Sequence, residues 1–537
     1  MRPVRQLKKG FHELKWQAHR PPPVIWIPAF LIGAAVILPH IYLVLRALGA
    51  GEDLWDLLFR IRTLQVLART LLLIIGVSVV SVAVALPLAW LTNRTDMPFR
   101  RLWAVLTALP LVIPSYVAGF IVVAALGPRG MLQRLLEGPF GVLRLPEIYG
   151  FPGALLTIVL VSYPLVLINL RASLRGIDPF LEEASRSLGQ GQWSTFRHVV
   201  LPQLRPAIAS GALLVALYTL RDFGAVSLLR YETFTWAIYL QYESSFDRTM
   251  AAGLSMVLIG VALTILFIEA MVRGKGQYYR SSSGSRKPPA PVRLGRWRWP
   301  AFSFCAMVSL IALFIPIAVL LYWLIEGVSR GEPFHLVWGL AINSVYASLL
   351  AAGVAVLFSL PVAVLAVRYP GRISSFVERS TYIGFGLPGI VVALALVFFG
   401  AHYAGPLYQT LWLLIFAYVI LFLPQAVGAT RGSLIQISPR LEEAARSLGR
   451  KSLQILVTIT LPLVRSGLLA GAVLIFFSTM KELPATLILS PIGFKTLAIS
   501  IWSATSEAFF TRAAAPALLL IITSAVSMAF LNIGERG

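Results

Sequence analysis

The side chains that most often build catalytic and metal centres are scarce in this sequence of 537 residues. It has a single cysteine, Cys305, and six histidines, no two of which stand at a spacing typical of metal ligands. One cysteine excludes a disulfide framework and a cysteine-based metal site. No Gly-x4-Gly-Lys-Ser/Thr segment occurs, so the phosphate-binding loop of an ATPase is also missing. We therefore expect no enzyme activity and no tightly bound cofactor in this chain.

Charge is scarce as well. Only 13% of the residues are charged, whereas 58% are hydrophobic and the mean hydropathy is +0.79. This balance excludes an ordinary soluble globular protein. Acidic residues are the rarer kind, at 23 against 46 lysines and arginines, which leaves a formal net charge of +23.

That positive charge is distributed as in a membrane protein. Cations gather between apolar runs, for example at 94–101, 273–298 and 368–379, as the positive-inside rule expects when the N-terminus lies inside. Membrane topology therefore explains the charge, with membrane lipid as a partner, and we expect no nucleic-acid partner.

What the sequence does contain is long apolar runs, each close to the roughly 20 residues that a helix needs to cross a membrane. Because the runs are continuous and do not alternate, they favour helices over a barrel. We predict an all-α polytopic membrane protein with about twelve spans. They lie near 24–48, 66–93, 103–127, 153–170, 205–229 and 249–272, and then near 300–326, 343–367, 381–401, 408–430, 466–489 and 510–532.

A polar phrase occurs twice between these runs. Residues 178–189 read DPFLEEASRSLG, and residues 438–449 read SPRLEEAARSLG, so that nine of twelve positions match at a separation of 260 residues. A Leu-Pro pair follows each copy at the same distance, at 201–202 and 461–462. A duplicated polar segment between apolar runs indicates a docking surface present on two halves of one protein.

Other segments repeat too. Residues 85–89 (ALPLA) correspond to 359–363 (SLPVA), and residues 221–225 (RDFGA) correspond to 481–485 (KELPA). Each half has six spans, which predicts a parallel repeat about an axis normal to the membrane. We expect a basic cytoplasmic tail at 1–23, a first domain at 24–273, a solvated cytoplasmic linker at 274–299 and a second domain at 300–537, with both termini in the cytoplasm.

The repeated phrase has the chemistry of a helix start. Asp178 or Ser438 can cap the helix, and the glutamates that follow lie in its positive first turns. Gly189 and Gly449 allow a sharp stop, and a second short helix is expected from about 191 to 199. The residues that we expect to meet a partner are Glu182, Glu183, Ala184 and Gly189, and Glu442, Glu443, Ala444 and Gly449. The alternative is a short helix lying on the membrane surface.

These loops resemble the coupling loops of ABC-importer permeases, which read Glu-Ala-Ala, then Gly, then Ile-x-Leu-Pro. The second copy matches fully, whereas the first has Ser185 and Val199 at two of the positions. The resemblance covers the chain as two fused six-helix permease domains of the type I importer kind. It implies that each loop docks on a separate ATPase subunit that binds ATP and Mg²⁺, two copies in all, and that a periplasmic solute-binding protein docks on the opposite face of a bacterial inner membrane.

Acidic residues at membrane depth are costly and are therefore candidates for function. Asp222 and Glu482 occupy equivalent positions in the two fifth spans, where a two-fold arrangement could bring both toward a central path. Each follows a cation, so the alternative is an ion-paired structural carboxylate near a helix end.

Several segments of the first half, such as 113–117 (IPSYV), 126–130 (LGPRG) and 221–231, resemble the permeases of ferric-iron importers. This resemblance implies Fe³⁺ as the transported substrate. Ferric ion favours carboxylate and phenolate oxygen, which Asp222, Glu482, Tyr116 and Tyr218 could supply along the path, with the two carboxylates as metal ligands.

Other cargoes remain open. Thiamine importers also have fused permeases, and polyamine or sulfate importers use related chains. A secondary transporter that needs no ATPase is a further alternative, but it would need buried ionisable relays, in which this chain is poor.

Overall fold

The computed structural model describes residues 21–49, 56, 59–128, 130–141, 144–244, 248–274, 291–332 and 335–534. These residues form helices joined by short loops, and the only strand-like pairing among them is one β-bridge between Thr95 and Val292. Most of the predicted tail and linker lie outside the described residues. An all-helical chain satisfies its backbone groups internally, as lipid requires.

Ten helical segments in the described part of the chain are long and apolar enough to cross a membrane. Those of the first half contain α2 (Pro23–Leu48), α4 (Ile61–Arg94), α6 (Ser115–Leu126), α8 (Phe151–Gly176), α11 (Leu201–Arg221) and α14 (Arg248–Gly274). Those of the second half contain α15 (Arg298–Ser309) with α16 (Ile315–Ser329), α17 (His335–Arg368), α20 (Leu411–Gln436) and α23 (Leu461–Met480). The other two predicted spans correspond to shorter apolar helices, α19 (Gly389–Tyr403) and part of α26 (Phe510–Gly534). The predicted fold class is confirmed.

The third span of each half is not the single helix that we predicted. The span at 103–127 contains α5 (Arg100–Leu106), the 3-10 turn η1 (Leu109–Val112) and α6, and the span at 381–401 crosses from α18 (Arg372–Gly386) into α19. The breaks fall before Pro114 and Pro388. A proline moves the preceding residue out of the helical region, and Ile113 and Leu387 accordingly have ψ angles of 120° and 139°.

The fifth span of each half is broken as well. The predicted helix at 205–229 stops at Arg221 and resumes as α12 (Gly224–Leu228), and the one at 466–489 stops at Met480 and resumes as α24 (Pro484–Leu489). The breaks therefore occur at Asp222 and Glu482. Irregular backbone at membrane depth is tolerated where protein surrounds it, and here it places a carboxylate in each half.

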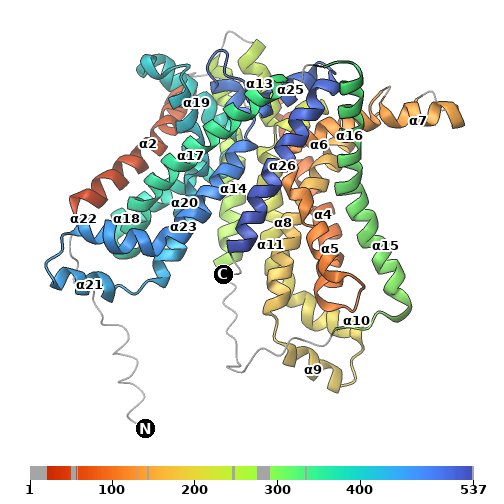
Figure 1. Ribbon diagram of the computed structural model, residues 1–537, viewed down its shortest axis with the longest axis horizontal. Helices are drawn as coiled ribbons and strands as arrows, with labels where there is room; N and C mark the ends of the chain where they lie inside the picture. Colours follow the sequence, from red (N-terminus) through yellow and green to blue (C-terminus); the bar gives the residue numbers. More distant parts are fainter. Residues whose placement is uncertain are drawn as a thin grey trace.

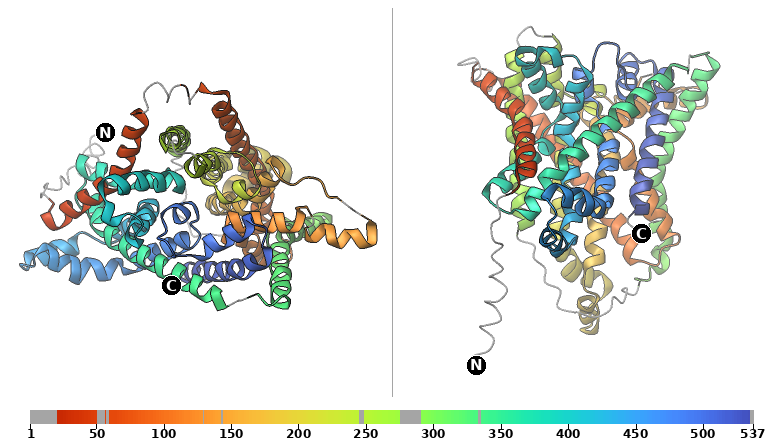
Figure 2. Two further views of the ribbon diagram at one scale, coloured as in Figure 1. Left: turned by 90° about the horizontal axis from the view of Figure 1, so that it is seen from above. Right: turned by 60° about the vertical axis from the view of Figure 1, so that its left-hand side comes forward.

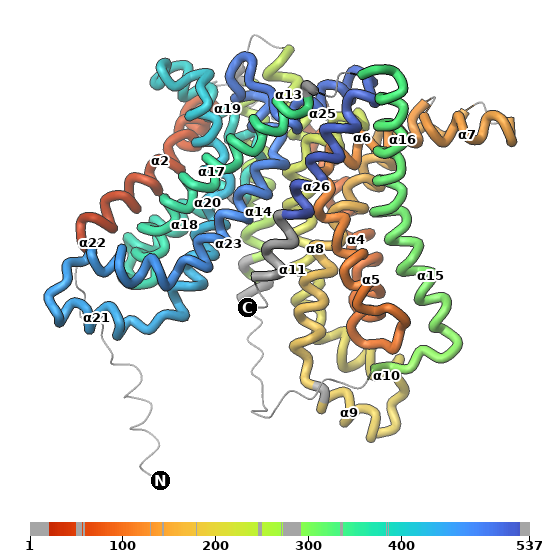
Figure 3. The backbone as a smooth tube through the Cα atoms, viewed as in Figure 1, coloured from red at the N-terminus to blue at the C-terminus, as the bar shows by residue number. Residues whose placement is uncertain are grey.

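The first helix of each half packs against the other half. Helix α2 contacts α17, α18 and α19, whereas η4 (Leu310–Phe314) and α16 contact α8 and α6 of the first half. Figure 3 shows α2 beside α18 and α19, and α15 and α16 beside α5 and α6. Figure 2 shows the same arrangement from above. The two halves are therefore interlocked.

The two ends of the molecule differ. Short helices of the repeated phrase, α9 (Pro179–Ser187) and α21 (Arg440–Ser447), project at one end, far apart from each other (Figure 1). At the other end lie α7 (Met131–Phe140), α13 (Phe234–Ser244) and α25 (Leu497–Ser506), where the halves meet.

Two equivalent glycines allow the fourth and fifth spans to approach closely. A Cβ atom on Gly211 would lie 3.0 Å from the Cα of Val166, and one on Gly471 would lie 3.1 Å from the Cα of Ala426. Small residues at a crossing let helix backbones pack tightly in membranes. The same crossing is thus built twice.

We predict that Gly471→Val destabilises the protein by about 1–3 kcal/mol, as overpacking of a tight contact does. The apparent melting temperature of the purified protein should fall. Gly353→Val is the matched control, because a side chain at Gly353 meets open space. Equal melting temperatures for both variants would contradict the tight crossing.

Candidate functional site

The first repeated loop presents an exposed helix face. Helix α9 begins at Pro179, where the Asp178 side chain accepts a hydrogen bond from the Phe180 amide at 3.1 Å, as the predicted cap requires. Its end is the predicted glycine stop, since Gly189 has a φ angle of +83°. Glu183 and Ala184 are exposed, and Leu188 is 84% exposed. Phe180, Leu181 and Trp193 are exposed as well, and a group of apolar side chains left in solvent marks a surface that a partner can cover.

The second loop repeats this surface. Helix α21 has Glu443 and Ala444 exposed, Leu448 is 83% exposed, and Gly449 has a φ angle of +81°. The start of the second helix differs from the first. Pro439 occupies the N-cap position in place of the predicted Ser438, and no side-chain cap hydrogen bond forms.

The first glutamate of each pair does not face solvent. Glu182 is buried and forms an ion pair with Arg94 at 3.0 Å, and the Arg94 guanidinium also donates to the Leu174 carbonyl oxygen at 2.9 Å. Arg94 is the last residue of α4. Our prediction that Glu182 offers its carboxylate to a partner is wrong, because that carboxylate fastens the loop to the second span.

The second half uses the same anchor. Glu442 is buried and pairs with Arg368, the last residue of α17, at 3.0 Å. Arg368 also donates to the Ile437 carbonyl oxygen at 3.2 Å, and the Thr460 hydroxyl lies 3.3 Å from Glu442. The prediction for Glu442 is therefore corrected in the same way as that for Glu182.

The expected second short helix is not separate. In the first half, α10 (Gln192–Thr195) runs through a π-helical segment, η2 (Phe196–Val200), directly into α11. In the second half, α22 (Ser452–Ile455) runs through η6 (Leu456–Thr460) into α23. Such π segments are rare and often mark functional positions. Each loop is thus continuous with the fifth span of its half.

The end of the predicted linker is not a free tether. The Val292 amide donates to the Arg94 carbonyl oxygen at 2.7 Å, and the Leu294 amide donates to the Asp96 carboxylate at 2.9 Å. The end of the linker therefore contacts Arg94, the residue that pairs with Glu182. The hydrogen bonds among the described residues include no equivalent contact between the linker and Arg368.

Asp222 and Glu482 cap the short helices that follow them. The Asp222 carboxylate accepts hydrogen bonds from the amides of Ala225 at 3.0 Å and Val226 at 3.3 Å, and the Glu482 carboxylate accepts one from Ala485 at 3.2 Å. A negative side chain at a helix N-terminus is favourable. Both carboxylates therefore lie at helix ends, where they accept hydrogen bonds from backbone amides.

The neighbouring cations tie the two halves together. Lys481 of the second half donates to the Leu111 carbonyl oxygen of the first half at 2.8 Å. Arg221 of the first half lies close enough to Glu482 of the second to interact electrostatically. The Trp502 indole of α25 donates to the Ser227 hydroxyl of α12 at 3.1 Å.

The structure brings the four predicted path residues into one region. Tyr116 is buried, its hydroxyl has no hydrogen-bond partner, and it lies within electrostatic range of Glu482 and Tyr218. Tyr218 in turn lies within range of Asp222. No cluster of three or more His, Cys, Asp or Glu side chains occurs in the described part of the chain, so a metal here would rely on hydroxyl oxygens as well.

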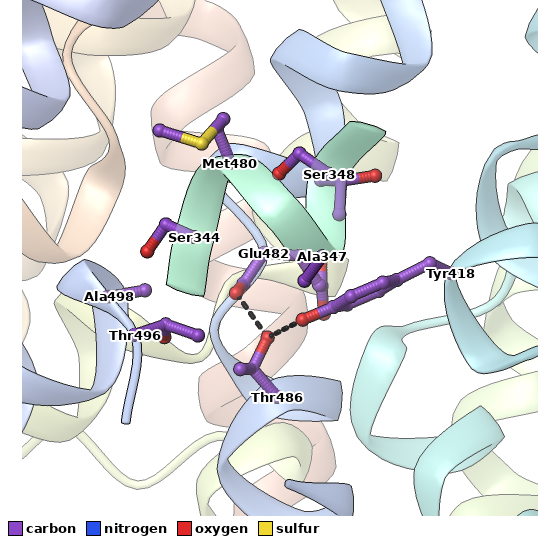
Figure 4. A pocket seen from close by; sticks show the side chains of 10 residues that line it. Ser344, Ala347, Ser348, Tyr418, Met480, Glu482, Thr486, Thr496 and Ala498 are labelled. Carbon is purple, nitrogen blue, oxygen red and sulfur yellow. Dashed lines mark hydrogen bonds between the residues drawn. The ribbon is translucent and has the colours of Figure 1, made fainter. Parts of the chain in front are cut away.

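A small cavity opens beside Glu482 (Figure 4). It is lined by Ser344, Ala347, Ser348, Tyr418, Thr479, Met480, Glu482, Thr486, Thr496 and Ala498. Sequence reasoning missed these hydroxyl residues because they come from separate helices and meet only through tertiary packing. It also treated Arg94 and Arg368 only as topology signals, because each lies far along the chain from the glutamate with which it pairs.

The sequence is similar to a protein family and to several known proteins. A family profile described as "Binding-protein-dependent transport system inner membrane component" matches residues 81–276 and again residues 355–537. The chain is 36% identical over 96% of its length, and 98% of the relative, to the Fe(3+)-transport system permease protein FbpB 2 of Haemophilus influenzae. It is 27% identical over 83% of its length, and 66% of the relative, to the ferric transport system permease protein FbpB of Actinobacillus pleuropneumoniae. The molybdenum transport system permease protein ModB of Escherichia coli is 33% identical over 37% of this chain and 91% of ModB.

The anchor of the second loop can be tested without a partner. Removing one charge of a buried pair costs about 3–5 kcal/mol, so Glu442→Gln should loosen α21 and speed its amide hydrogen exchange at least tenfold. Glu443→Gln, on the exposed neighbour, should leave the exchange unchanged. Equal protection in both variants would show that the Arg368 pair does not hold the loop.

Proposed function

The chain belongs to the family of binding-protein-dependent transport system inner membrane components, and from this premise we propose that it supplies both membrane-spanning halves of an ATP-driven importer of ferric iron. The observation that carries this proposal is the pair of matched loops, each with an exposed apolar face and a buried ion pair to a long span. The chain itself transmits force and forms the path. ATP hydrolysis takes place on partner subunits.

Each loop docks on one of two ATPase subunits, at 178–202 and 438–462. The exposed faces around Glu183 and Leu188, and around Glu443 and Leu448, support this docking because they are otherwise left in solvent. When ATP binding draws the ATPase subunits together, the loops move with them.

The loops have two mechanical connections to the spans. The buried ion pairs connect α9 to α4 and α21 to α17, and the π segments connect the loops directly to α11 and α23. A displacement of a loop is thus passed to the second and fifth spans of its half. Rearrangement of the halves about their shared axis then alternates access to the centre.

The cargo is ferric iron carried to the outer face by a solute-binding protein. The similarity to two ferric permeases over most of this chain supports this assignment, whereas the molybdenum relative corresponds to one half only. The centre also offers the oxygen ligands that a hard cation favours, on Asp222, Glu482, Tyr116 and Tyr218.

The orientation follows from the docking sites. The side with α9 and α21 is cytoplasmic, and the side with α13 and α25 faces the binding protein (Figure 1). Both termini are cytoplasmic, and the permease domains extend over 24–273 and 300–537 within the bacterial inner membrane.

The cargo is tested by uptake of radiolabelled Fe³⁺ into vesicles that contain this chain, its ATPase and its binding protein. ATP-dependent accumulation is expected only with the iron-loaded binding protein. In the double variant Asp222→Asn, Glu482→Gln, uptake should fall about 100-fold or more, because two contacts to charged groups are lost and each is worth about 1.5–3 kcal/mol. ATP hydrolysis without any iron uptake by the unmodified chain would move the cargo to thiamine or another small cation.

The docking surface is tested separately with the double variant Glu183→Gln, Glu443→Gln. We expect the stimulation of ATP hydrolysis by the loaded binding protein to fall about tenfold, the effect of losing about 1.4 kcal/mol. Docking of the binding protein, measured by its affinity for the reconstituted permease, should not change. Normal ATPase association and uptake in this variant would remove the two carboxylates from the docking surface.

A further inference from the structure

The two halves differ at their centre in one respect that the repeat does not predict. In the second half, Ser348, Tyr418 and Thr486 line the cavity beside Glu482. The equivalent positions in the first half, at offsets of 274 or 260 residues, are Ile74, Ile158 and Val226, all of which are buried. At these three positions the second half has hydroxyl oxygens, whereas the first half has buried aliphatic side chains.

The two carboxylates are adapted to these surroundings. Asp222 is buried and makes a hydrogen bond with Ser115 as well as its two backbone contacts. The equivalent of Ser115 is Gly389, where an added Cβ atom would clash with the Glu482 carboxylate. The shorter side chain, Asp222, is therefore hydrogen-bonded to a serine, whereas the longer side chain, Glu482, occupies the space that is free because residue 389 is a glycine.

The cavity contains polar atoms without partners. Ser348 is fully buried and Thr479 is 4% exposed, yet neither hydroxyl has a hydrogen-bond partner in the structure. Buried polar groups are normally paired, so each such group calls for an explanation. Both residues line the same cavity, which has room for one water-sized ligand.

The hydrogen bonds around the cavity leave oxygen lone pairs available. The Thr486 hydroxyl donates its proton to the Glu482 carbonyl oxygen at 2.6 Å, so the Tyr418 hydroxyl, 2.7 Å from Thr486, must be the donor of that second bond (Figure 4). Because the Tyr418 hydroxyl donates its proton to Thr486, the lone pairs of the Tyr418 oxygen can still coordinate a cation. The lining has no Lys, Arg, His, Asn, Gln or Trp side chain that would donate to an anion.

We propose that this cavity is a binding site for one small hard cation, coordinated by the Glu482 carboxylate and by the hydroxyl oxygens of Ser348, Thr479 and Tyr418, and that the first half has no equivalent site. Carboxylate and hydroxyl oxygens are the ligands such cations prefer. This site rests on the proposed function, under which the cargo ion stops in the cavity, and Asp222, Tyr116 and Tyr218 lie along the path outside the ligand set.

The neighbouring cations make the site weak, which transport requires. Arg221 lies within electrostatic range of Glu482, so the arginine and a bound ion compete for the negative charge of the same carboxylate. A transport path must bind its ion strongly enough to admit it and weakly enough to release it. A site with one carboxylate beside an arginine binds a cation more weakly than a site made of several carboxylates, and therefore releases it more readily.

The test measures equilibrium binding of radiolabelled Fe³⁺, supplied as its nitrilotriacetate complex, to the complex of this chain with its ATPase. One saturable ion per chain is expected. Thr479→Val keeps the side-chain shape but removes one oxygen, and the affinity should fall about tenfold or more, since a contact to a charged species is worth about 1.5–3 kcal/mol. Ser348→Ile places in the second half the residue that the first half already has, and should abolish binding.

The repeat supplies the control. Thr219 is the first-half equivalent of Thr479, and its hydroxyl already donates to the Val215 carbonyl oxygen at 2.9 Å. Thr219→Val should bind Fe³⁺ as the unmodified chain does. Three results would each overturn the proposal: equal loss of binding in Thr219→Val and Thr479→Val, unaltered binding in Ser348→Ile, or no saturable binding to the unmodified chain. The last result would leave a water molecule as the occupant of the cavity.

Uptake by the same variants separates this inference from the proposed function. Full iron uptake by Ser348→Ile and Thr479→Val would reject the site and leave the ferric importer in place. The other informative outcome is an unmodified chain that binds the ion saturably but takes up no iron. If Ser348→Ile and Thr479→Val then lose that binding, the result would reject the ferric cargo and support the cation site.

Discussion

Two buried arginine–glutamate pairs hold the loops of this protein to its long helices. A buried ion pair is expensive to form, because both charges leave water, and it persists only with good geometry and further hydrogen bonds. Here Arg94 and Arg368 each reach a backbone carbonyl oxygen as well as their glutamate. Each arginine ends a helix of 34 residues, so the pairs join the short loop helices α9 and α21 to two of the longest helices described.

Much of this architecture could be predicted from the sequence, because hydrophobic runs and an internal repeat are strong signals. The positions of Asp222 and Glu482 at equivalent points also followed from the repeat. The helix breaks beside them did not, since an apolar run predicts a span and says little about its continuity. Pro114 and Pro388 were the available clues for the third spans.

The role of Glu182 and Glu442 could not be predicted for a different reason. Adjacent residues on a short helix point in different directions, and the sequence alone does not tell which of two neighbouring glutamates faces inward. That choice depends on Arg94 and Arg368, which lie many residues away and meet the loops only through the tertiary packing of α4 and α17. The hydroxyl-lined cavity was missed for the same reason, since Ser348, Tyr418 and Thr479 come from three helices.

The exchange of first helices between the halves has a consequence for biosynthesis. Helix α2 ends at Leu48, but α17, the first of its second-half neighbours, begins only at His335. At about 5–20 residues per second, the ribosome needs roughly 15–60 s to make the intervening chain. During that time α2 must remain in the bilayer without those neighbours, with lipid covering the surface that they later bury. The first half therefore completes its packing only after much of the second half has been inserted.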